Sequence, residues 1–164
     1  MDICGPYPET KLGNRQLLTF IDHFSRYPKA IPLPRQDAST VAPALVTEMF
    51  LRLDCPQTIA SDRGTNFISE LFQEICNLLQ VKRINSKSFN PRLQGKVESF
   101  HQGLNQSMSD HINKYGDDWD EVINYALMAH RAVPLSIIRY SPFYLFYGRE
   151  MRLPAEDNLT PGEL

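Results

Sequence analysis

The chain has 164 residues, of which 42% are apolar, and this is enough for one domain with an ordinary core. Its 17 basic and 19 acidic residues give a net charge of −2, so composition alone indicates neither a nucleic-acid nor a membrane partner. No apolar run is long enough to cross a bilayer, and the cysteines, Cys4, Cys55 and Cys76, form no C-x-x-C pair. We therefore expect reduced thiols and no membrane association.

The first half of the chain predicts strands followed by alternating helices and strands. The segments QLLTFIDHF, from Gln16, and KAIPL, after Pro28, are β-rich, and the break between them predicts a hairpin. DASTVAPALVTEMFLRL has helical spacing, with Pro43 in the first turn. QTIASD and VKRIN predict short strands on either side of a helix over FISELFQEICNLL. The residues of that helix expected to face inward are Leu71, Phe72, Ile75, Leu78 and Leu79.

The second half predicts three helices. The first runs from Val97 to Ile112 and presents Glu98 in its first turn. In DDWDEVINYALMAHRAV, Asp118 lies three residues before Glu121, which is the spacing of a capping box. In SPFYLFYG, Ser141 is the expected N-cap and Gly148 the C-terminal stop. The order of elements predicts an α/β domain with a mixed sheet over residues 1–150, and an irregular tail over 151–164.

Three acids are the candidate site: Asp2 at the beginning, Asp62 after a short strand, and Glu98 at a helix start. Carboxylates brought together repel unless they protonate or hold a divalent cation, and oxygen ligands without nearby His or Cys favour Mg²⁺ or Mn²⁺. Taken singly, Asp62 also fits ordinary turn chemistry, Glu98 fits a first-turn acid that complements the helix dipole, and Asp2 fits a terminal residue.

A basic stretch lies between the second and third of these acids. Its members are Lys82, Arg83, Lys87, Arg92 and Lys96, and no acid falls between Val81 and Val97. The stretch fits either a contact with phosphates or a solvated loop.

The sequence motifs around the three acids decide between these interpretations. SDRGTNF, thirty-five residues between Asp62 and Glu98, and then NPRLQGKVESF closely resemble the catalytic core of retroviral and retrotransposon integrases. That family has acids in D-I-x-G-P, S-D-x-G-x-x-F and N-P-x-x-x-G-x-V-E, which fall here on Asp2, Asp62 and Glu98. The resemblance continues through WDEVINYALMAHRA to SPFYLFYGREMRLP, which is typical of gypsy-type elements, and covers nearly the whole chain.

The resemblance implies an RNase H-like fold, with a five-stranded mixed sheet flanked by helices. It implies 3′-end processing of element DNA and strand transfer of that end into target DNA. Two Mg²⁺ (or Mn²⁺) ions are implied, both bridged by Asp2, with Asp62 completing one site and Glu98 the other. We expect DNA contacts from Asn66, Lys87, Arg92 and Lys96. A homo-oligomer and a nuclear location are also implied, although no targeting signal is visible in the chain.

Three further expectations follow from the resemblance. Asp22 also lies on a predicted strand, but the family places its acid in the preceding one, so we expect Asp22 to be structural. The four histidines do not pair with the cysteines at zinc spacing, so we expect neither zinc nor the zinc-binding domain that such integrases usually carry. Because the family's first acid lies inside a strand, we expect Met1 to cut that strand and the chain to be a fragment or an imperfect gene model.

Departures from the family pattern keep an alternative function open. Ser99, Gln102 and Asn105 stand where gypsy-type elements usually have basic residues, and Gly103 places a glycine inside a helix. The turn before SPF reads LSIIR, at residues 135–139, instead of a small polar sequence. The alternative is an inactive or domesticated fragment that serves as a nucleic-acid-binding or protein-interaction module. An RNase H is a third hypothesis, against which the SPFYLFYGRE segment argues.

Overall fold

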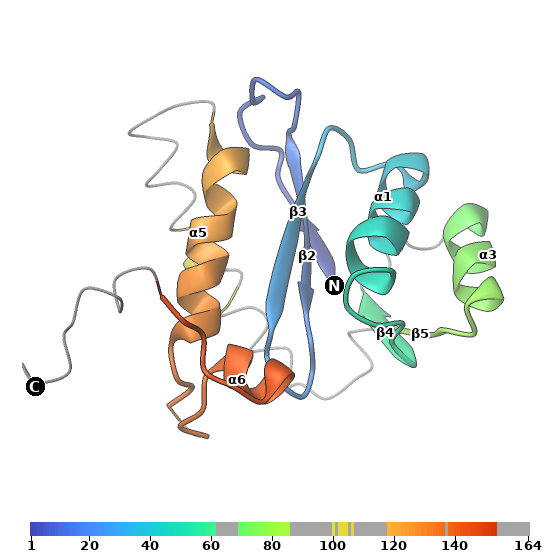
Figure 1. Ribbon diagram of the computed structural model, residues 1–164. Coiled ribbons are helices and arrows are strands. Elements are labelled where there is room, and N and C mark those ends of the chain that lie inside the picture. The colour runs from blue at the N-terminus through green and yellow to red at the C-terminus, as the bar shows by residue number, and fades with distance from the viewer. Residues whose placement is uncertain are drawn as a thin grey trace, which may run out of the picture.

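The computed structural model describes residues 1–61, 69–85, 100, 102–104, 106, 118–136 and 138–153. Its described elements form three layers (Figure 1). Helix α5 (Trp119–Ala132) lies on one side of a central sheet, and helix α1 (Ala38–Leu45) lies on the other. Helix α3 (Glu70–Leu78) lies outside α1, and the short helix α6 (Pro142–Tyr147) lies below α5 in that view.

The described strands fall into two sheets. Strands β1 (Asp2–Cys4), β2 (Gln16–Ile21) and β3 (Pro28–Leu33) are antiparallel in the order β1-β2-β3, which confirms the predicted hairpin. Strands β4 (Thr58–Ser61) and β5 (Lys82–Asn85) form a parallel pair. The amino group of Met1 donates a hydrogen bond of 2.7 Å to the carbonyl of Ala60, so the start of β1 lies beside β4.

Strand β2 separates two hydrophobic clusters because alternate side chains of a strand point to opposite faces. Leu18 and Phe20 pack on the side of α1 and α3, against Val41, Leu45, Ile59 and Phe72. Leu17 packs on the side of α5, in a second cluster whose buried members also include Ala30, Leu104, Trp119, Ile123 and Leu127. The core therefore lies on both faces of the sheet, as expected for an α/β domain.

Side-chain caps fix where several helices begin. Asp37 Oδ1 accepts a hydrogen bond of 3.0 Å from the Thr40 amide, and Ser69 Oγ accepts one of 3.3 Å from the Phe72 amide. Ser141 Oγ likewise accepts one of 2.9 Å from the Tyr144 amide, and Gly148 ends α6 with a left-handed φ of 72°. The predicted cap and stop of this last helix are thus confirmed.

The inward face predicted for α3 is wrong in part. Phe72 and Cys76 are its buried residues, whereas Leu71, Leu78 and Leu79 are exposed, Leu78 at 82%. Because α3 is an outer helix, only one side of its broad apolar arc meets the α1 layer. Periodicity alone identified that arc but not which part of it is covered.

Two local expectations about helix starts are also corrected. Pro43 lies in the second turn of α1, where its ring is exposed to solvent, and the helix continues into a π-helical turn, η1 (Val46–Phe50). Asp118 is the N-cap residue of α5, but its side chain makes no capping hydrogen bond. Its φ of −114° and ψ of 19° depart from the extended backbone that a capping side chain requires.

The end of the described chain is irregular. Residues 151–153 belong to no helix or strand, and the rest of the predicted tail lies outside the described residues. Among the helices of the described ranges, none combines the length and apolar character needed to cross a membrane.

Candidate metal centre

Asp2, the first of the three predicted metal ligands, lies at the start of β1. It pairs with Thr19 of β2, whose hydroxyl donates a hydrogen bond of 3.1 Å to the Asp2 carbonyl. The Asp2 carboxylate is partly exposed, and its Oδ1 accepts a hydrogen bond of 2.8 Å from the Ile3 amide. Strand pairing therefore fixes the backbone of this residue while its side chain remains accessible to solvent.

Cys4 lies two residues after Asp2 and so on the same face of β1. Burial, together with the negative charge of Asp2, raises the pKa of the Cys4 thiol to about 11, against a smaller opposing effect of a hydrogen bond with Thr19. At neutral pH the thiol is protonated and is a poor metal ligand. The Asp2 carboxylate offers oxygen ligands, which suit Mg²⁺ or Mn²⁺.

The other two predicted ligands, Asp62 and Glu98, lie outside the described residues, as do Asn66, Lys87, Arg92 and Lys96. Their nearest described neighbours can be placed. Ser61, the last residue of β4, follows directly on Ala60, whose carbonyl is bonded to Met1. Phe100, two residues after Glu98, packs against the same cluster as Cys4 and Trp119. The structure thus places the end of β4 beside the start of β1, and Phe100 packs against the same cluster as Cys4 of β1.

Of the three predicted metal ligands, Asp2 alone lies within the described residues. Within the described ranges, no three His, Cys, Asp or Glu side chains are grouped so that they could hold a metal ion. The carboxylate of Asp2 fits a Mg²⁺ ligand in its chemistry, and the convergence of the triad stays a prediction.

Asp22, the rival for the first acid, has its carboxylate engaged in the β2–β3 turn. Its Oδ2 accepts hydrogen bonds of 2.7 Å from both the amide and the hydroxyl of Ser25, which is itself buried. The backbone closes the same turn, since the Asp22 amide donates to the Tyr27 carbonyl at 3.0 Å. This geometry supports the expected structural role.

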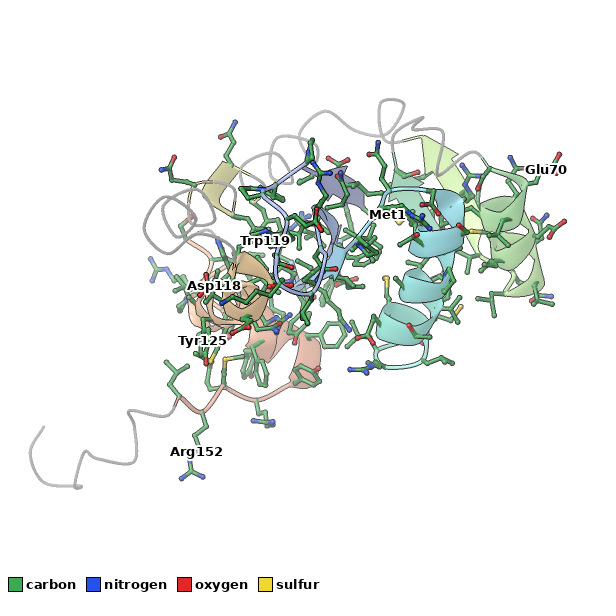
Figure 2. The ribbon with its side chains drawn as sticks, turned by 90° about the horizontal axis from the view of Figure 1, so that it is seen from above. Met1, Glu70, Asp118, Trp119, Tyr125 and Arg152 are labelled. Carbon is green, nitrogen blue, oxygen red and sulfur yellow. The ribbon has the colours of Figure 1, made fainter. Side chains whose placement is uncertain are left out.

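A clasp between the β1–β2 loop and α5 was not predicted from the sequence. Thr10 Oγ1 and Asn14 Nδ2 both donate to Asp120 Oδ2, at 2.6 Å and 2.7 Å, and Thr10 is buried. Trp119, the residue before Asp120, is buried in the interior (Figure 2), and its indole donates a hydrogen bond of 2.8 Å to the Pro8 carbonyl. The loop that follows Asp2 is therefore fastened to the first turn of α5.

The signals for this clasp were weak in the sequence. The sequence shows a glycine at position 13, which adopts a left-handed φ of 79° in the structure, and a single tryptophan at position 119. Thr10 and its partner Asp120, however, are 110 residues apart in the chain. A polar residue in a loop and an acid in the first turn of a helix are each common when taken separately.

Comparisons with known proteins agree with these observations. The family described as "Integrase core domain" matches residues 1–91. The retrovirus-related Pol polyprotein from transposon 412 of Drosophila melanogaster is 29% identical over 158 residues, which are 96% of this chain and 13% of the polyprotein. The chain thus spans about an eighth of the length of that relative.

Solved structures show the same fold. The catalytic core domain of BIV integrase superposes with a TM-score of 0.71 at 18% identity, covering 88% of this chain and 91% of that one. The HTLV-2 integrase catalytic core, solved in complex with magnesium in a trimeric form, gives a TM-score of 0.67 at 18% identity, covering 88% of this chain and 100% of that one. With the family match over more than half of its residues, the chain belongs to the integrase core domain family, and its α/β architecture is the RNase H-like fold of integrase catalytic cores.

Proposed function

We propose that this chain is the catalytic core of a gypsy-type retrotransposon integrase, which processes the 3′ ends of element DNA and transfers them into target DNA with divalent metal ions. The observation that carries the proposal is the position of Asp2. Asp2 lies on β1, and a hydrogen bond from Met1 to Ala60 joins the start of β1 to the end of β4. Strand β4 ends at Ser61, and Asp62 is the next residue in the chain. The chain itself belongs to the integrase core family. Membership of the family and the likeness to transposon 412 support the reaction and the type of element.

Asp2, Asp62 and Glu98 are the residues that would hold the metal ions. Bound Mg²⁺ would activate the attacking oxygen and stabilise the leaving oxygen of a phosphoryl transfer. The chain's own contribution is to bring the three carboxylates together and to orient them, and the pairing of Asp2 with Thr19 supports such a fixed orientation. That the HTLV-2 core was solved with magnesium is consistent with this ligand set.

We also propose that the two observed sheets act as one five-stranded mixed sheet in the order β3-β2-β1-β4-β5, within a domain over residues 1–150. The proposed order requires β1 of one sheet to lie beside β4 of the other. The hydrogen bond from Met1, directly before β1, to Ala60 of β4 supports this.

The partners proposed are element and target DNA, and further copies of the chain. Asn66, Lys87, Arg92 and Lys96 would contact phosphates, and the trimeric form of the HTLV-2 core supports a homo-oligomer. Integration into chromosomes would require a nuclear location, which we propose on the resemblance alone. Sedimentation of the purified chain and imaging of a tagged chain test these two points.

The test of the reaction is a disintegration assay on a branched DNA oligonucleotide, with Mg²⁺ or Mn²⁺. We expect metal-dependent joining by the chain, and its loss in Asp2→Asn, Asp62→Asn and Glu98→Gln. Asp22→Asn is the matched control, because Asp22 is used in a turn and its substitution should leave joining largely intact.

Two results would contradict the proposal. Absence of metal-dependent joining by a folded chain would favour the alternative of an inactive, domesticated module. Preferential cleavage of the RNA strand of an RNA–DNA hybrid would instead favour an RNase H.

A further inference from the structure

Helix α6 and the loop before it carry a surface of aromatic rings and arginines, which we name the α6 surface. Its residues are Arg139, Tyr140, Phe143, Tyr144, Tyr147 and Arg149. The rings of Tyr140 and Tyr144 stack with centroids 4.9 Å apart and planes within 14°, and those of Phe143 and Tyr147 lie 4.7 Å apart. Tyr140 and Tyr147 remain 49% and 47% exposed. We call these two partly open ring pairs the aromatic platform.

The loop before α6 is built so that Tyr140 joins this platform. The Arg139 amide donates to the Leu135 carbonyl at 2.7 Å, and the Leu135 amide donates to the Tyr140 carbonyl at 3.0 Å. Arg139 adopts a left-handed φ of 61°, a conformation that disfavours residues with a side chain. A strained residue persists only where its surroundings fix it, and Arg139 directly precedes Tyr140, whose ring stacks on Tyr144. This loop is the LSIIRY segment that departs from the family pattern.

The charge around the platform is positive. Arg149 lies over the Phe143 ring at 5.1 Å from its centroid, and Arg139 is exposed beside Tyr140. Residues 138–153 contain three arginines and a single acid, Glu150, whose carboxylate accepts a hydrogen bond of 3.2 Å from Ser141. Arg152 projects from the chain that leaves α6 (Figure 2). An occupant of this surface should therefore be anionic and should present flat faces.

Single-stranded nucleic acid has both properties, because its phosphates are anionic and its unpaired bases are free to stack on aromatic side chains. Paired bases are hidden inside a duplex, so a duplex could use only the arginines. We propose that the α6 surface binds single-stranded nucleic acid, with bases on the exposed tyrosine rings and phosphates on the arginines.

This site is separate from the proposed metal centre. The α6 rings pack on Tyr27, which directly precedes β3, with the Tyr27 and Phe146 centroids 4.6 Å apart. None of the three acids belongs to this segment, so binding here should need no divalent metal. The two proposals can thus fail independently.

The test is a fluorescence anisotropy titration of the full chain in EDTA, with labelled oligo(dT), oligo(U) and a DNA duplex. A length of about 15 nucleotides covers a typical site. We expect Tyr140→Leu with Tyr147→Leu to weaken binding of the single strands by roughly fivefold to a hundredfold for each lost base stack, and to affect the duplex little. Equal losses for DNA and RNA probes would mean that stacking dominates, and a larger loss for one would identify the preferred strand.

The arginines are tested by salt dependence. Arg139→Gly should reduce the slope of log K against log[salt] by about 0.7, the value expected for one lost phosphate contact to a single strand. This variant relieves the left-handed strain at residue 139, so it should fold even if the tyrosine variant does not. Arg35→Gln, at an exposed arginine after β3, is the charge-matched control, and Tyr125→Leu, at an α5 tyrosine 70% exposed, is the ring-matched control.

Several results would overturn the proposal. One is single-strand binding by the tyrosine and arginine variants that equals that of the unaltered chain. Another is an equal loss in the Arg35→Gln and Tyr125→Leu controls. A third is a change in sedimentation of the tyrosine variant without a change in nucleic-acid affinity, which would make the α6 surface a protein contact. Retention of binding by Asp2→Asn in EDTA is expected and separates this site from the metal centre.

Discussion

Asp120 shows how one side chain can fasten distant parts of the chain. Its Oδ2 accepts hydrogen bonds from Thr10 and Asn14, and Thr10 Oγ1 in turn accepts from the Asn14 amide at 3.1 Å. Removing Asp120 Oδ2 would leave the proton of the buried Thr10 hydroxyl without an acceptor, and a buried donor that loses its acceptor destabilises more than the bond itself stabilised.

We predict that Asp120→Ala lowers the free energy of unfolding by about 1–3 kcal/mol. Asp120→Asn keeps an acceptor oxygen at the same place and should lower it by less. Urea denaturation of the two variants beside the unaltered chain measures the difference. Equal stability of Asp120→Ala and the unaltered chain would show that the clasp contributes nothing to folding.

His130 gives a residue-scale prediction about pH. Its ring lies 5.2 Å from that of Phe100, and burial lowers the pKa of the imidazole below its ordinary value of 6.5. The unfolded chain therefore binds a proton before the folded chain does, so stability is lost as pH falls below about 6.5. We expect His130→Gln to reduce the loss of unfolding free energy as pH falls below about 6.5. Identical slopes for the two chains would contradict this.

At the scale of elements, β3 illustrates how the open edge of the β1–β3 sheet is protected. Pro28 and Pro32 cannot donate to a further strand, and the Pro28 carbonyl accepts hydrogen bonds of 3.0 Å and 2.8 Å from the guanidinium of Arg131. The same guanidinium lies over the Tyr27 ring, 4.6 Å from its centroid. Burial lowers the pKa of Arg131, and the nearby Tyr27 and Tyr147 oppose this shift. Helix α5 thus both covers the sheet and closes its edge.

The loop between α5 and α6 gives an element-scale prediction. Because Arg139 has a φ of 61°, glycine should fit this position better than any residue with a Cβ. We expect Arg139→Gly to be more stable than Arg139→Ala by about 1 kcal/mol, since both remove the charge and only glycine removes the strain. Thermal unfolding of the pair measures this, and a more stable alanine variant would show that the loop is not strained.

For the whole molecule, the two hydrophobic clusters meet at the sheet that carries Asp2. One cluster anchors β4 through Ile59, and the other holds Phe100 and Leu104 beside Trp119. In the sequence, Asp62 follows Ile59 by three residues, and Glu98 precedes Phe100 by two residues. Binding of a cation by the triad would therefore couple both halves of the core.

We predict that Mg²⁺ or Mn²⁺ raises the Tm of the chain, because a ligand that binds only the folded state stabilises it by mass action. At a metal concentration one hundred times the dissociation constant the gain is about 2.7 kcal/mol. Asp2→Asn and Asp62→Asn should abolish this gain, while Asp22→Asn should keep it. A metal-induced rise that persists in Asp2→Asn would remove this residue from the ligand set.

Local sequence signals predicted most described elements because the forces concerned are local. The alternation in β2, the caps at Ser141 and Gly148 and the apolar spacing around Trp119 and Ile123 are examples. The errors arose where neighbours far along the chain decide. Leu71 and Leu78 of α3 are exposed because α1 covers only one side of that helix, and the backbone at Asp118 takes a conformation unsuited to side-chain capping. Of the candidate site, Asp2 was placed on a strand as expected, and Asp62 and Glu98 lie outside the described residues.

The sequence by itself determined the family and the order of the described strands and helices, because sequence motifs and short-range periodicity are properties of neighbouring residues. The three acids stay a prediction of the same motifs. Tertiary structure alone decided that Asp120 clasps the β1–β2 loop and that Arg131 closes the edge of β3. The clasp and the edge contact join residues more than 100 positions apart. Such contacts depend on how elements pack, and packing is decided by the whole chain at once.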